Sequence, residues 1–175
     1  MKKGSELRAR YNDINRGVYF IGTTPPKNDT PIEQVSAIAD KLLERVSDVD
    51  FDGLIVYDIQ DEDSRTSQPR PFPFKTTHDP RLYSSLLNKK SARPVITYKS
   101  VVQSNADDFE QWANDAWHDY GVRDIVLVGS PSKQNNISLP LTDAYKTLVA
   151  NENDFLLVVS RLLNAMQTKA MSMLS

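Results

Sequence analysis

The chain has 175 residues, a formal net charge of −2 and no cysteine. That length suits one domain with a real core, and the absence of cysteine excludes disulfides and thiolate metal sites. The balanced charge and the lack of a basic stripe argue against a nucleic-acid partner. No apolar run approaches the ~20 residues of a membrane span, and the charged N-terminus lacks a secretory signal, so we expect a cytoplasmic protein with no membrane partner.

Short apolar runs alternate with helical patterns along the chain. Buried-type strands are predicted at Val18–Ile21, Gly53–Tyr57, Pro94–Tyr98 and Asp124–Gly129. Apolar residues recurring every three or four positions predict helices after Thr30, after Asp79, after Ser104 or Asn105, and over Ser138–Val149.

Helix boundaries have clear sequence signals. Thr30 is the expected N-cap of the first predicted helix, with Pro31 at its first position and Glu33 completing a capping box. Asp79 before a proline predicts the next cap. Gly121 is expected to end the third predicted helix.

This alternation predicts an α/β fold of parallel βα units with right-handed crossovers. Four units fit a small doubly wound sheet, and they equally fit the first half of a TIM (βα)8 barrel. Periodicity does not decide between these two folds. In both, sites form at the carboxyl ends of the strands.

A long polar loop follows the second predicted strand. Its carboxylates are Asp58, Asp61, Glu62 and Asp63. They indicate either a general acid or a solvated acidic turn paired with arginines. A hard-cation loop needs ligands at fixed offsets and a turn glycine, which this loop lacks, so no metal site is predicted.

Two other strand ends carry candidate residues. Gly22–Lys27 follows the first strand, and its motif alone favours a rigid turn over a ligand-binding loop, whereas Gly129–Ser132 ends the fourth strand and fits a ligand-binding loop and a plain turn equally. Neither contains the GxGxxG or P-loop pattern. His78 and His118 have no partner at metal-ligand spacing.

Taken together, these strand ends resemble the methylenetetrahydrofolate reductase family, over about Val18 to Leu157. The similarity rests on Thr24–Lys27, on Tyr57–Arg65 with Arg70–Phe74, and on Trp117–Gly129. It implies a TIM barrel that carries flavin adenine dinucleotide (FAD). NAD(P)H would reduce the flavin, which then passes a hydride to methylenetetrahydrofolate in one-carbon metabolism.

The resemblance also implies site residues at the strand ends. Those implied for FAD are Tyr57, Arg65, Thr97, Tyr98, Gly129 and Ser130. Those implied for the folate are Thr24, Gln60 and Glu62. No catalytic residue is assigned, because Gly22 stands where the family has its acidic glutamate. Ser130 stands where the family has an aspartate near the flavin.

These two departures keep a second function open, that of a non-catalytic or methyl-transfer-associated folate-binding protein. Flavin reduction by a nicotinamide cofactor would favour the enzyme, whereas folate binding without flavin would favour the binder.

The C-terminal segment has two interpretations. Residues after Leu157 have the spacing of a docked helix. Alternatively, a back-translation with freely chosen third bases reads, in a shifted frame, as a segment resembling the family's fifth strand. On that hypothesis residues 1–157 are the N-terminal half of a reductase-like barrel and 158–175 are an out-of-frame tail. We then expect an inactive fragment that self-associates through open sheet edges.

Overall fold

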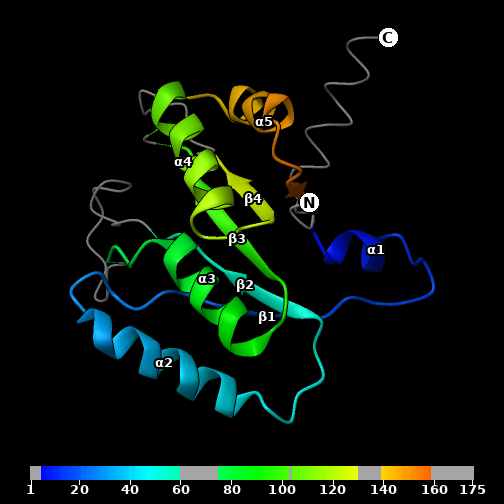
Figure 1. Cartoon of the computed structure of the whole chain (residues 1–175), viewed down its shortest axis with the longest axis vertical. Helices are drawn as coiled ribbons and strands as arrows, with labels where there is room; N and C mark the ends of the chain where they lie inside the picture. Colours follow the sequence, from blue (N-terminus) through cyan, green and yellow to red (C-terminus); the bar gives the residue numbers. More distant parts are fainter. Residues whose placement is uncertain (1–4, 60–74, 103, 130–138, 159–175) are drawn as a thin grey trace, which may run out of the picture.

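The structure is a computed structural model that describes residues 5–59, 75–102, 104–129 and 139–158. These residues form one parallel sheet with flanking helices (Figure 1). The strands are β1 (Phe20–Thr23), β2 (Gly53–Val56), β3 (Val95–Ser100), β4 (Asp124–Val128) and β5 (Leu156–Leu157). The helices are α1 (Leu7–Tyr11), α2 (Ile32–Arg45), α3 (Pro80–Ser91), α4 (Ala106–His118) and α5 (Leu141–Ala150).

The order of the strands decides between the two predicted folds. They lie in the order β1-β2-β3-β4-β5, and each pairs in parallel with the next. A doubly wound sheet would reverse its order at a switch point, whereas a barrel does not. The prediction of an α/β fold with parallel βα units is therefore confirmed, and the winding is that of part of a TIM-barrel-like sheet.

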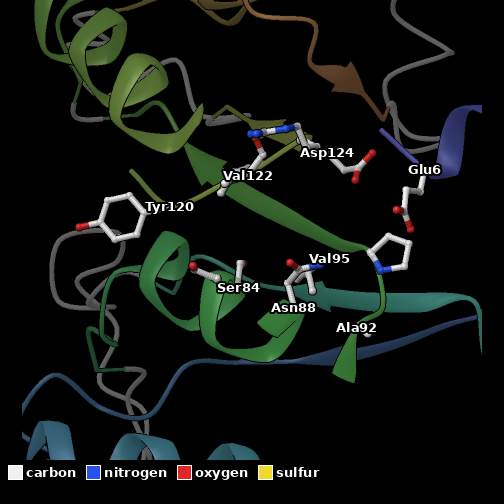
Figure 2. A pocket seen from close by; sticks show the side chains of 12 residues that line it. Glu6, Ser84, Asn88, Ala92, Val95, Tyr120, Val122 and Asp124 are labelled. Atoms are coloured by element: carbon white, nitrogen blue, oxygen red, sulfur yellow. The ribbon is translucent and has the colours of Figure 1, made fainter. Parts of the chain in front are cut away.

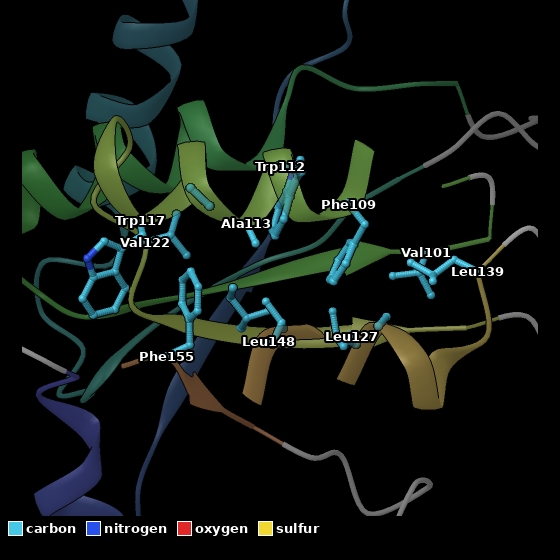
Figure 3. Packing of buried hydrophobic residues seen from close by; sticks show 13 residues of the cluster. Val101, Phe109, Trp112, Ala113, Trp117, Val122, Leu127, Leu139, Leu148 and Phe155 are labelled. Atoms are coloured by element: carbon cyan, nitrogen blue, oxygen red, sulfur yellow. The ribbon is translucent and has the colours of Figure 1, made fainter. Parts of the chain in front are cut away.

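One face of the sheet, here called the outer face, is covered by α2 to α5. Side chains of α2 and α3 pack with Leu54, Val56 and Val95. A second cluster joins α4 and α5 to Ile125 and Leu127 (Figure 3). All connecting helices lie on this face because crossovers between parallel strands share one hand.

The opposite face, here called the inner face, carries fewer covering residues. Its apolar side chains are Phe20, Ile55, Ile96, Tyr98, Val126, Leu156 and Val158. Leu7 of α1 is fully buried against this group. No helix was predicted there, although Leu7 and Tyr11 have the spacing of one helical turn. Five residues are too few for a convincing periodic signal.

The N-terminal segment is fastened to the sheet by Asp52, which directly precedes β2. Its carboxylate accepts hydrogen bonds from the Tyr19 N–H at 3.0 Å, from Arg10 at 2.9 Å and from Arg16 at 2.6 Å. These bonds lower the pKa of Asp52, and the bond from the Tyr19 amide has the largest effect. The carboxylate therefore aligns the chain as it enters β1.

The predicted helix starts are partly right. Asp79 caps α3 by accepting the Arg81 N–H at 2.8 Å, and Asn105 caps α4 by accepting the Asp108 N–H at 2.8 Å. Gly121 has a φ of +70° just after α4, as predicted. The capping box is wrong: α2 begins at Ile32, its N-cap is Pro31, and no side chain caps it.

Element boundaries also differ from the sequence analysis. β1 begins two residues later than predicted and continues to Thr23. β5 was not predicted as a fifth strand, and it pairs with β4 at Asp124 and Ile125. The postulated out-of-frame tail lies almost wholly outside the described residues and stays a prediction.

Candidate functional site

The candidate site lies on the inner face, at the carboxyl ends of β1 to β4. Tyr57 directly follows β2, and one further step of the β2–β3 register places it opposite Tyr98. Their ring centroids are 5.0 Å apart with an interplanar angle of 65°. This edge-to-face contact is a favoured arrangement of aromatic rings. The sheet therefore presents two neighbouring aromatic rings at the end where parallel sheets build sites.

These two rings remain partly accessible. Tyr57 is 37% exposed and Tyr98 is half-buried. Burial raises the pKa of Tyr98, and the neighbouring Tyr57 raises it further. A tyrosine that stays protonated keeps its hydroxyl as a hydrogen-bond donor. The pair thus combines flat apolar area with donor groups.

Gly22 lies beneath the Tyr57 ring. A Cβ atom built on Gly22 would lie 2.8 Å from Tyr57 Oη and 2.9 Å from Cε2. Real Cβ atoms essentially never approach other atoms so closely. The ring therefore fills the space that any side chain at this position would need.

Thr97 does not join this group. Its side chain is fully buried on the outer face, where its hydroxyl donates to Ser84 of α3 at 2.8 Å. Neighbouring strand residues point to opposite faces, so Thr97 and Tyr98 cannot face the same ligand. The Thr97 side chain therefore does not face the inner-face site to which the resemblance assigned it. It links α3 to the sheet instead.

In the turn after β1, Thr24 is exposed. The residues that follow it in the turn are bonded to the segment before α3. Lys27 forms a β-bridge with Thr77, and the His78 N–H donates to the Pro26 carbonyl at 2.9 Å. The His78 ring contacts the Thr30 carbonyl at 2.8 Å. Thr24 is thereby presented at the carboxyl end of β1 on a supported turn.

Gly129 lies at the end of β4, as predicted, but it is not forced to be glycine. A Cβ there would meet Leu141 at 3.4 Å, an ordinary contact. The other predicted site residues, Arg65, Ser130, Gln60 and Glu62, lie outside the described residues, and so do Asp61 and Asp63.

Asp58 and Lys99 form a polar cluster beside the site, and of the two only Asp58 was a candidate from the sequence. Asp58 accepts the Ser100 N–H at 2.8 Å and so ties the end of β2 to β3. Lys99 lies over the Trp112 ring on the outer face, 5.3 Å from its centroid. Burial lowers the pKa of Lys99, while Asp58 and Asp79 oppose that shift. The cluster braces the strand ends behind the two tyrosines.

FAD was implied by resemblance, and the described residues fit it only in part. Tyr57 and Tyr98 suit a flat ring system. A diphosphate over the inner face would find neither Lys99 nor the Thr97 hydroxyl, because both belong to the outer face. Among the described residues, no group of three or more potential ligands could hold a metal ion.

A cavity of about 310 Å³ opens at the opposite, amino end of β3 and β4 (Figure 2). Ser84 and Asn88 of α3 line one wall, while Val122 and Asp124 line another. Burial raises the pKa of Asp124 to about 6, although the Ser5 hydroxyl donates a hydrogen bond to its carboxylate. The amino end of a barrel sheet generally serves stability, so we place the functional site at the carboxyl end.

Comparisons with known proteins show a likeness to a solved structure. No protein-family model and no curated protein matches the chain. Among solved structures, the chain is similar to an uncharacterized protein from Clostridium thermocellum that binds two copies of 5-methyl-5,6,7,8-tetrahydrofolic acid. The TM-score is 0.63 and the sequences are 28% identical. The match covers 89% of this chain and 47% of that protein, so this chain spans about half of its length.

The described part of the chain has no helix that combines the length and the apolar character needed to cross a membrane.

Proposed function

We propose that this chain binds a reduced folate at the carboxyl ends of β1 to β4. The observation that carries the proposal is the contact of Tyr57 with Tyr98 above Gly22, an accessible aromatic pair at the functional end of a barrel-type sheet. The likeness to a protein that binds 5-methyltetrahydrofolic acid supports the choice of ligand. A pterin offers a flat pyrimidine ring for aromatic contact and amide groups for hydrogen bonds.

Membership of the methylenetetrahydrofolate reductase family is part of this proposal. The resemblance of Trp117–Gly129 supports it, and so does a sheet wound in the order of a barrel. On this account residues 1–157 are the first half of a folate-binding barrel. The match to about half of the C. thermocellum protein favours that division.

A second candidate function is the flavin-dependent reduction of methylenetetrahydrofolate by NAD(P)H. The polar strand ends that resemble the family favour it. Against it stands Gly22, which carries no carboxylate and whose place for a side chain is taken by the Tyr57 ring. We therefore rank folate binding without reduction first.

Isothermal titration calorimetry with 5-methyltetrahydrofolate tests the first function, and the absorbance spectrum of the purified protein tests the second. Saturable binding by a protein without flavin absorbance supports the folate-binding function. Co-purified flavin that NAD(P)H bleaches would favour the reductase. Binding of neither ligand would contradict both.

A further inference from the structure

Gly22 and Tyr57 form a matched pair, and the structure shows what each requires of the other. The Tyr57 ring reaches back across β1 until its hydroxyl and ring edge lie where a Cβ at position 22 would be. The Tyr57 N–H donates to the Thr23 carbonyl at 3.0 Å, which fixes its backbone beside β1. The ring can hold this place only while position 22 has no side chain.

Tyr98 restrains the same ring from the other side. Its centroid lies 5.0 Å from that of Tyr57, and the angle of 65° leaves a face of Tyr57 free of this contact. Tyr57 is still 37% exposed. An aromatic ring held at two sides and open at a third loses little conformational entropy when a ligand packs against it.

We infer that Tyr57, positioned by Gly22 and Tyr98, is the specificity-determining residue for the pterin ring. This inference rests on the proposed function. The ring contacts the flat part of the pterin, and the hydroxyl donates a hydrogen bond to it. The pair thereby replaces an acidic side chain on β1 with a phenol supplied by β2.

This replacement changes what the site can do. A carboxylic acid can protonate a bound ligand near neutral pH, whereas a phenol is a much weaker acid and mainly donates a hydrogen bond. A site built in this way holds a folate that needs no protonation, such as a methylated and already fully reduced one. It is not built to activate a methylene-bridged folate for hydride transfer.

The contact predicts a specific pattern of coupling between the two residues. Gly22→Ala should weaken binding of 5-methyltetrahydrofolate about tenfold or more, because its Cβ displaces the Tyr57 ring. Tyr57→Ala should weaken binding by a similar or larger factor. In the Tyr57→Ala background, Gly22→Ala should have no further effect, because the new methyl group then has room.

The same titrations separate the ring from the hydroxyl. Tyr57→Phe keeps the ring and should weaken binding about 5- to 10-fold, as expected for one lost hydrogen bond. Tyr145→Phe is the matched control, because Tyr145 is an exposed tyrosine on α5. The affinity of this variant for 5-methyltetrahydrofolate should equal that of the wild type.

Isothermal titration calorimetry of all variants with 5-methyltetrahydrofolate measures this pattern, with circular dichroism confirming that each is folded. Additive effects of Gly22→Ala and Tyr57→Ala, or wild-type affinity in Tyr57→Ala, would overturn the inference and leave folate binding intact. A wild-type protein that binds no folate would overturn the proposed function and this inference with it.

Discussion

At the residue scale, Asp124 has the most unusual environment among the described carboxylates. Burial raises its pKa from 3.8 to about 6, and Glu6 acts in the same direction. The Ser5 hydrogen bond and the positive charges of Arg8 and Arg123 oppose the shift. Because the folded state holds this proton more tightly than the unfolded state, protonation of Asp124 stabilises the fold. That contribution is complete below about pH 3.8 and is lost as the pH rises through about 6.

Asp124→Asn should therefore stabilise the protein at neutral pH. We expect a gain on the order of 1–3 kcal/mol near pH 7.5 that disappears toward pH 4. Urea unfolding across this pH range measures it. Asp154→Asn is the control, since that carboxylate is largely exposed and pairs with Arg8 at the surface. An Asp124→Asn variant that is less stable than the wild type at neutral pH would contradict this assignment.

The residue scale also shows the limit of sequence reasoning about the site. Tyr57 and Tyr98 were expected as site residues because the resemblance to the reductase family implied them for the flavin. The packing of Tyr57 over Gly22 could not be predicted, because the direction of an aromatic ring depends on space left by a neighbouring strand. The face on which Thr97 lies could not be predicted for a related reason: strand alternation assigns it to one face, but the sequence does not say which face the helices cover.

At the element scale, we expect Asp79 to contribute more to the stability of α3 than Asn105 contributes to that of α4. Both residues cap a helix, but Asp79 also binds the Arg81 guanidinium, with the Nη2–Oδ2 distance at 2.6 Å. Arg81 is itself mostly buried, donates to the Trp112 carbonyl and lies over the Trp112 and Tyr120 rings. Removal of Asp79 would leave this arginine without its closest partner.

We therefore expect Asp79→Ala to lower the free energy of unfolding by about 2–3 kcal/mol, and Asn105→Ala to lower it by about 1 kcal/mol. Urea unfolding of the two variants compares a cap that anchors an arginine with a cap that does not. Equal losses of stability would show that Arg81 finds other partners and that Asp79 acts as a cap alone.

The secondary elements themselves were largely predictable. Residues that recur at helical spacing, such as Val35 and Ala39 or Phe109 and Trp112, are buried as expected. The elements that were missed are the shortest helix, α1, and the shortest strand, β5. A two-residue strand such as Leu156–Leu157 is defined by its pairing with β4, and pairing between distant segments leaves no local pattern.

At the scale of the whole molecule, the sequence could not choose between a doubly wound sheet and a barrel. Both repeat the same βα unit, and only the order of strands distinguishes them. That order is fixed by long-range contacts such as Gly22 with Ile55 and Thr97 with Ile125. The resemblance to a barrel family, not periodicity, led to the right winding.

Open sheet edges predict self-association of the isolated chain. In the described part of the chain, β1 pairs only with β2 and β5 pairs only with β4. Val128 adds exposed apolar surface at the end of β4. Unpaired strand edges beside apolar surface favour association. Sedimentation velocity should show mass increasing with concentration, whereas a monomer at every concentration with a sharp cooperative melt would refute this expectation.

The central claim is that a reduced folate binds at the carboxyl ends of the strands. The most direct test is a two-dimensional amide NMR titration of the isotope-labelled chain with 5-methyltetrahydrofolate. We predict shifts for Gly22, Thr24, Tyr57, Tyr98 and Gly129. Shifts confined to the amino-end cavity, at Ser84, Asn88 and Val122, or no shifts at all, would contradict the account.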